Sequence, residues 1–148
     1  MNILWFILFL PIFARVIGLS FAMTLLPLRK ELGILMGVLA WVHSTAYIVE
    51  YPTWILDPLF WWSKGNITYF TVGVIALLLT TPLLLTSNEW AIRKLGKRWK
   101  LLHRLVYAIA IFTVAHVVLI TWVNQGMVDY TYPAILVIYF FGKILEWR

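Results

Sequence analysis

The sequence contains no cysteine and very little charge. Of its 148 residues, 12% are charged and 63% are apolar, and the mean hydropathy is +0.90. The absence of cysteine excludes disulfides, iron–sulfur clusters, thiolate catalysis and covalent c-type haem attachment. A soluble domain of this size carries about a quarter charged residues and could not bury this much hydrocarbon. The apolar surface must therefore face lipid, which predicts a membrane protein.

The sequence also has no GxGxxG motif for a flavin or nicotinamide, and no segment long enough for a separate soluble domain. The N-terminal stretch 1–26 has no basic region and contains Arg15, so it is interpreted as a helix rather than a cleaved signal peptide. The net charge of +6 comes from short loops between apolar runs. This pattern indicates membrane topology and no nucleic-acid partner. We expect a single transmembrane domain over residues 1–148.

Five apolar runs approach the roughly 20 residues that a membrane-spanning helix needs. They predict an all-α fold, a polytopic helix bundle of about five transmembrane helices in the inner (plasma) membrane. The expected spans are, in chain order, about 2–26, 32–50, 67–87, 101–123 and 131–146.

Lysine and arginine predict the orientation of this bundle. With five spans, ten basic residues share one side, Lys64 is alone on the other, and Arg15 lies within a span. Because cytoplasmic loops carry the excess of Lys and Arg, we expect the N-terminus outside and the C-terminus in the cytoplasm. The ten residues are Arg29, Lys30, Arg93, Lys94, Lys97, Arg98, Lys100, Arg104, Lys143 and Arg148.

The three histidines, His43, His103 and His116, fall in or at the edge of predicted spans. Ionisable groups are rare there and usually functional. At 1.5 Å per residue, His43 lies about 16 Å and His116 about 22 Å from the cytoplasmic start of its span. Two imidazoles at a similar depth on different helices suit the two axial positions of a haem iron in a bundle core.

Small residues near both histidines fit two interpretations: room for a flat macrocycle, or close helix packing without a cofactor. Zinc would need three or four ligands, and neither cysteine nor clustered carboxylates supply them. A proton relay would need acids within the spans, but all six acids lie at span ends or in loops. Haem is favoured over both. The small residues are Gly33, Gly37 and Ala40 near His43, and Ala108, Ala110 and Ala115 near His116.

His103 and Arg29 suggest a second haem site nearer the cytoplasmic side. They precede His116 and His43 by 13 and 14 residues, so they share a level about 20 Å away. On a straight helix, however, 13 residues end about 140° from the starting face, so His103 and His116 would not point the same way. The alternative is an interfacial histidine among cationic neighbours.

Arg15 lies midway along the first predicted span, where a charge costs at least ~2.5 kcal/mol. A functional role is expected for it, as a partner of a haem propionate, of a quinone, or of a carbonyl freed near Pro11.

Several stretches of the sequence resemble the ferric-reductase-like transmembrane domain superfamily. Within it, the chain looks most like the MsrQ group, the haem-bearing membrane subunits of bacterial methionine-sulfoxide reductase systems. This resemblance implies a b-type haem between His43 and His116. Superfamily members with two haems have a further histidine 14 positions before the first, where this chain has Arg29, which leaves the second site to His103. The stretches are LPLRKELGILMG, AWVHSTAY, ITYFTVGVIALLLTTPLLLTS, and IRKLGKRWKLLHRLVY followed by AHVV.

The expected function is electron transfer across the membrane. A haem with two axial histidines has no open iron position for a substrate, so it carries single electrons. The donor would be membrane quinol or a separate cytoplasmic flavin reductase. The resemblance implies that the acceptor is an extracytoplasmic oxidoreductase that repairs methionine sulfoxide. The alternatives are a small ferric or metal reductase and a non-redox structural or assembly protein.

Overall fold

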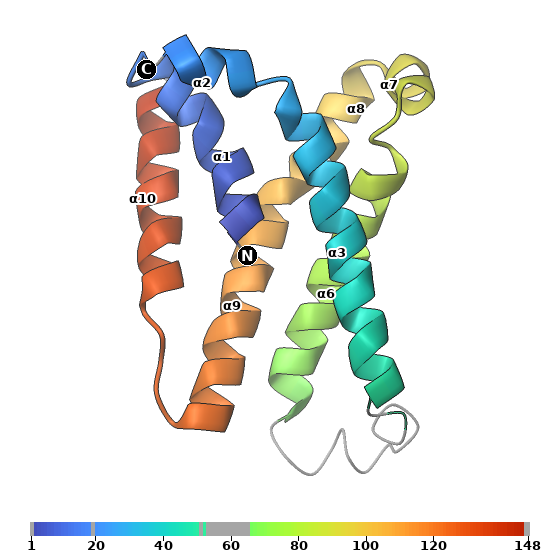
Figure 1. The fold of residues 1–148 in the computed structure, drawn as a ribbon, viewed down its shortest axis with the longest axis vertical. Coiled ribbons are helices and arrows are strands. Elements are labelled where there is room, and N and C mark those ends of the chain that lie inside the picture. The colour runs from blue at the N-terminus through green and yellow to red at the C-terminus, as the bar shows by residue number, and fades with distance from the viewer. Residues whose placement is uncertain (1, 19, 51, 53–65, 147–148) are drawn as a thin grey trace.

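The computed structural model describes residues 2–18, 20–50, 52 and 66–146. Every helix or strand assigned within these ranges is an α-helix, which confirms the predicted all-α class. The helices, labelled as in Figure 1, are α1 (Asn2–Arg15), α2 (Ser20–Leu25), α3 (Leu28–Glu50), α6 (Asn66–Leu85), α7 (Glu89–Leu95), α8 (Lys97–Leu102), α9 (Leu105–Gln125) and α10 (Thr131–Glu146).

The helices α3, α6, α9 and α10 run along the length of the molecule, and α2, α7 and α8 gather at one end (Figure 1). α6 packs closely along α9 on one side and against α3 on the other. α1 contacts α3 and α10, and α10 also packs on α9. α6 therefore stands between the two helices that carry His43 and His116.

The first predicted span is broken. Gly18, with a φ of +71°, separates α1 from α2. This left-handed conformation ends a helix and is readily adopted only by glycine. α2 then packs back on α1, where Ala22 joins Ala14 in a small buried cluster. The expectation of one continuous helix over 2–26 was wrong, because apolar periodicity does not register a single turn-forming glycine inside an apolar run.

The other predicted helices agree with the structure to within a few residues, except for the fourth. There α8 precedes α9, and the two meet at His103 and Arg104. In this junction the N–H groups of Val106 and Tyr107 bond to carbonyls three residues back, as in a 3₁₀ turn. Each tightened residue adds about 20° of rotation, so the straight-helix angle between His103 and His116 does not apply here.

Two helices are long and apolar enough to cross a membrane, Leu28–Glu50 and Lys97–Gln125. α6 and α7 make a third if this pair, bent by 91°, counts as one span. α1 and α10 are apolar but have 14 and 16 residues, or about 21 and 24 Å. That is less than the roughly 30 Å hydrocarbon core of a bilayer. The described residues thus contain two or three candidate spans, and the total of five stays a prediction.

The best-packed core lies where α1, α9 and α10 meet. Leu8 and Tyr139 are almost fully buried there, beside Ala110 of α9. Gly142 lets α10 approach α1 closely, since a Cβ at this position would lie 3.1 Å from the side chain of Ile12. The α3 side is much more open, with Gly37 the single buried residue among the 23 of that helix.

The basic residues collect at one end of the bundle. The N-terminal end of α3, the α7–α8 segment and the C-terminal end of α10 all lie there (Figure 1). These segments carry nine of the ten residues assigned to the cytoplasmic side, and Arg148 and Lys64 lie outside the described residues. An ion pair of 3.9 Å between Lys30 and Glu89 joins α3 to α7 at this end. Which side of the membrane this end faces stays a prediction.

Candidate functional site

His116 on α9 is fixed by a hydrogen bond to the backbone of α6. Its Nδ1 lies 2.7 Å from the carbonyl oxygen of Tyr69. Because a carbonyl oxygen only accepts, Nδ1 carries the proton, and Nε2 of the neutral ring keeps a free lone pair. A backbone carbonyl bound to one ring nitrogen is the usual support for a histidine that binds metal through the other.

Gly73 makes this contact possible. A Cβ at position 73 would lie 2.8 Å from Nδ1 and 2.9 Å from Cε1 of His116. A helical side chain covers the turn that precedes it, so a larger residue at 73 would also cover the Tyr69 carbonyl. The glycine is therefore required for the His116 ring to lie against α6.

His43 is exposed on α3 and lies close enough to His116 for the two imidazoles to interact electrostatically. α3 meets α6 through Gly37, where a Cβ would lie 3.1 Å from Leu84. Six residues further along, His43 is about 120° around the helix from Gly37. The structure thus brings His43 and His116 near each other, with His43 outside the tight contact between α3 and α6.

Tyr69 connects both histidine-bearing helices. Its side chain shares a hydrogen bond with that of Tyr47, which lies one turn beyond His43 on α3. Its carbonyl holds His116 of α9, and its ring centroid lies 6.3 Å from the imidazole. Next to it, the rings of Tyr47 and Phe70 meet edge to face at 5.0 Å. Tyr69 is itself only 7% exposed, so this connection lies within the packed part of the bundle.

Two of the six small residues predicted near the histidines serve helix packing. Gly37 contacts Leu84 of α6, and Ala110 is fully buried in the core formed with α1 and α10. At Gly33, a Cβ would meet nothing within 4 Å. The packing interpretation therefore holds for Gly37 and Ala110, whereas Gly73, outside the predicted set, is the glycine that contacts a histidine.

His103 belongs to a different cluster at the α6–α8 junction. Its Nε2 lies 3.2 Å from Oγ1 of Thr86, and its ring stacks on Trp99 at 4.0 Å. Trp99 also donates from Nε1 to the carbonyl of Thr86 at 2.9 Å. The Thr86 hydroxyl donates its one hydrogen to the carbonyl of Pro82, 2.6 Å away, so it accepts from His103. His103 therefore carries its proton on Nε2, the opposite tautomer to His116.

The two arginines singled out in the sequence lie at helix ends. Arg29 is in the first turn of α3, at the same end of the bundle as α8 and His103. Arg15 is the last residue of α1 and is exposed. The prediction that Arg15 lies midway along a span was wrong because the helix ends there. A cation at a helix C-terminus is favoured by the helix dipole.

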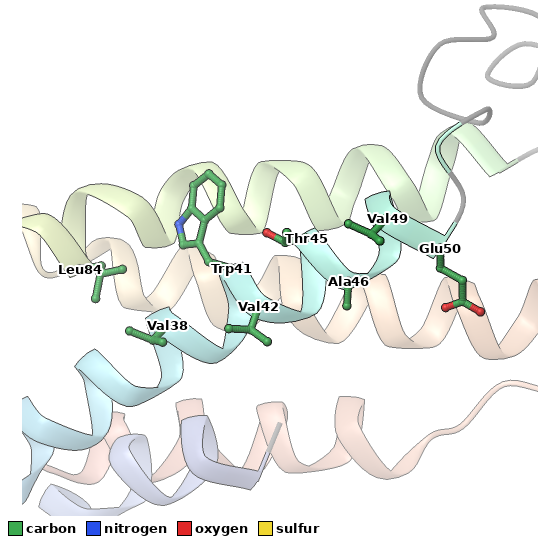
Figure 2. A pocket seen from close by; sticks show the side chains of 8 residues that line it. All are labelled: Val38, Trp41, Val42, Thr45, Ala46, Val49, Glu50 and Leu84. Atoms are coloured by element: carbon green, nitrogen blue, oxygen red, sulfur yellow. The ribbon is translucent and has the colours of Figure 1, made fainter.

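An apolar groove of about 660 Å³ runs along another face of α3 (Figure 2). None of the three histidines is among its lining residues. No group of three or more His, Cys, Asp or Glu side chains occurs among the described residues. The lining residues are Val38, Trp41, Val42, Thr45, Ala46, Val49, Glu50 and Leu84.

Comparison with known proteins places the chain in a family. The sequence model described as "Ferric reductase like transmembrane component" matches residues 1–114. The chain belongs to this family. The match includes His43 and His103 and ends two residues before His116. The family resemblance predicted from the sequence is thus confirmed, and with it the membrane character of this ferric-reductase-like chain.

Among curated proteins, the chain is similar to subunits named protein-methionine-sulfoxide reductase heme-binding subunit MsrQ, for example those of Agrobacterium fabrum and Brucella ovis. The Agrobacterium fabrum protein is 38% identical over 102 residues, which cover 67% of this chain and 46% of the relative. The Brucella ovis protein is 44% identical over 84 residues, 57% of this chain and 38% of the relative. The matched regions make up less than half of each relative. No solved structure matches.

The roles of Tyr69, Gly73, Thr86 and Trp99 were not predicted from the sequence. One signal was available for Gly73: it is a glycine in the middle of an apolar helix, four residues after a tyrosine. Such a glycine is costly in a helix and often marks a close approach of another group to the backbone.

Proposed function

We propose that this chain holds a b-type haem between His43 and His116 and carries electrons across the inner membrane. The proposal rests mainly on the hydrogen bond of His116. The carbonyl of Tyr69 accepts from Nδ1, so Nε2 has a lone pair for a metal, and His43 of a second helix lies nearby. Two neutral imidazoles are a donor set that haem iron accepts on its two axial positions. The names of the MsrQ relatives support the same cofactor.

In this proposal the protein supplies position and environment. His43 and His116 would bind the iron, and Tyr69 keeps His116 in the tautomer that can do so. Held by these two histidines, haem would supply reversible one-electron chemistry and would leave no iron position for a substrate.

The relatives' names support a proposal for the electron acceptor. Reduction of a methionine sulfoxide to methionine and water consumes two electrons and two protons, so two single-electron transfers serve one repair. We propose an extracytoplasmic oxidoreductase as the acceptor, and quinol or a cytoplasmic flavin reductase as the donor. This assignment assumes five spans, the N-terminus outside and the basic end in the cytoplasm.

The second haem at His103 with Arg29 has weaker support. His103 already uses Nε2 as a donor to Thr86, so iron binding through Nε2 would require this hydrogen bond to break. One haem per chain is therefore the simpler proposal.

Absorption spectra of the purified protein test the proposal. We expect a Soret band that shifts on reduction with dithionite, and one haem per chain. His43→Ala and His116→Ala should each abolish the low-spin spectrum, while His103→Ala should remove at most a minor component. A colourless protein would favour the structural or assembly alternative, and an unchanged spectrum in either ligand variant would refute the assignment.

The family description keeps a small ferric reductase as the second candidate. It predicts that the purified, reduced chain alone transfers electrons to ferric chelates outside the membrane. Reoxidation kinetics with and without a ferric chelate separate this activity from transfer to a protein partner.

A further inference from the structure

We propose that Gly73 and the backbone carbonyl of Tyr69 are positioning groups for the His116 imidazole. They set the orientation of this ring and, through it, the reduction potential of the haem that it would bind. The inference rests on the proposed haem function. It assigns a role to α6, a helix that carries no candidate ligand itself.

The first step is the exposure of a helical carbonyl. In an α-helix the carbonyl of residue 69 accepts the N–H of residue 73 and keeps a second lone pair. A side chain at 73 would lean toward the preceding turn and shield this lone pair. Because residue 73 is glycine, the carbonyl of Tyr69 is open to a donor from α9, and His116 occupies that place at 2.7 Å.

The second step is steric. The position of a Cβ at residue 73 lies only 2.8 Å from Nδ1 and 2.9 Å from Cε1 of the His116 ring. Real Cβ atoms essentially never approach that closely, so alanine at 73 must displace the imidazole or separate α6 from α9. The Nδ1 edge of the His116 ring is thus held both by its steric contact with position 73 and by its hydrogen bond to the Tyr69 carbonyl.

The third step is that α6 contacts both helices that carry the candidate ligands, α3 and α9. α9 is fixed to α6 through His116 and Tyr69, and α3 is fixed to α6 through the hydrogen bond between Tyr47 and Tyr69. His43 lies between this tyrosine contact and the Gly37–Leu84 contact on α3. α6 therefore determines how far apart the two candidate ligands stand.

The hydrogen bond from Nδ1 of His116 to the Tyr69 carbonyl also changes the basicity of the ring at Nε2. A donor Nδ1–H bound to a carbonyl makes the imidazole a stronger base at Nε2, which favours ferric over ferrous iron. Loss of the bond should raise the reduction potential and weaken haem retention. Loss of the hydrogen-bond partner of a metal-bound histidine typically costs about 10- to 100-fold in affinity for the metal.

Three glycine variants provide the test in the haem-loaded protein. We expect Gly73→Ala to lower haem retention by about tenfold or more, to change the low-spin electron paramagnetic resonance spectrum, and to raise the potential. Gly33→Ala, with nothing within 4 Å of the new Cβ, should change none of these. Gly37→Ala strains the α3–α6 contact at the Leu84 side chain, so it disturbs helix packing on the His43 side and leaves the contact between position 73 and His116 intact. A Gly73→Ala protein with the wild-type spectrum and potential would overturn the inference.

A second measurement depends neither on activity nor on a change at Gly73. Nitrogen-15 chemical shifts of labelled histidine, recorded on the dithionite-reduced wild-type protein, report which ring nitrogen carries the proton. With three histidines in the chain, each signal is assigned by His→Gln variants. We expect protonated Nδ1 at His116, and protonated Nε2 there would overturn the inference. If the protein holds no haem, the proposed function fails, but the same spectrum still reads the tautomer of His116.

Discussion

His103 donates a hydrogen bond from Nε2 to the hydroxyl of Thr86, 3.2 Å away. The direction is determined by Thr86, whose single hydroxyl hydrogen is given to the carbonyl of Pro82. The two histidines of the α8–α9 segment are therefore held in opposite tautomers, with Nε2 free in His116 and engaged in His103. Residue type and depth cannot distinguish two such candidate ligands, but their hydrogen bonds can.

Thr86→Val should release His103 without affecting the main haem site. Valine keeps the shape of threonine but removes the acceptor of the His103 bond, so we expect a loss of about 1 kcal/mol in stability and a change in the nitrogen-15 tautomer signal of His103. Haem content per chain should stay unchanged. Thr113→Val is the matched control, since the Thr113 hydroxyl bonds only to the carbonyl of Ile109 within its own helix. A large loss of haem in Thr86→Val would show that the cluster supports a cofactor.

The proposed orientation can be read with single cysteines, because the chain has none of its own. Lys97 of α8 and Met127 after α9 are both exposed and lie near opposite ends of the Lys97–Gln125 helix. We expect a membrane-impermeant maleimide to label Met127→Cys in intact spheroplasts, and Lys97→Cys only after the membrane is opened. The reverse pattern would invert the topology and exchange the sides of donor and acceptor.

Gly18→Ala should destabilise the protein, because residue 18 has a φ of +71°. The left-handed conformation costs an alanine about 1–2 kcal/mol, although a Cβ there would meet no neighbour within 4 Å. Gly33→Ala, inside α3 and equally free of neighbours, should instead stabilise by about 0.5–1 kcal/mol. Thermal unfolding of both variants in one detergent compares them. Equal melting temperatures would argue against the break between α1 and α2.

Hydropathy predicted the all-α class and the positions of several helices, because long apolar runs favour helices of spanning length. The helices over 28–50, 66–85 and 131–146 lie close to their predicted ranges. The break at Gly18 escaped prediction because a positive φ depends on one backbone torsion and leaves no mark in an apolar pattern. Arg15 was misplaced for the same reason, since its depth had been counted along a helix that ends at that residue.

The candidate ligands were predictable, but their supports were not. Rise per residue along two parallel helices was enough to suggest that His43 and His116 share a level, and the structure has them near each other. The supports depend on backbone atoms: the Tyr69 carbonyl, and the space left by the missing side chain of Gly73. Any residue has a carbonyl, so the sequence does not indicate which carbonyl will face a ring on another helix.

The loop between α9 and α10 offers a prediction that depends on pH. Asp129 accepts hydrogen bonds from the side chain and backbone of Thr131 at the start of α10, and these lower the pKa of its carboxyl group. In the unfolded chain the carboxyl titrates near its ordinary pKa of about 3.9. Since the folded pKa is lower, the stabilisation is fully present above the unfolded value and is lost as the pH falls through the folded pKa.

Asp129→Asn keeps an acceptor oxygen for the backbone of Thr131 but removes the charge that titrates. We expect the difference in melting temperature between wild type and this variant to be constant from about pH 5 to 7. This range lies roughly one to three pH units above the ordinary pKa of the carboxyl group. The difference should change only in more acidic solution, where the advantage of the carboxylate disappears. Because Asp129 is partly exposed in the loop, the change should be small and should weaken with added salt. A difference that already varies at neutral pH would mean that another group, and not this carboxylate, controls the start of α10.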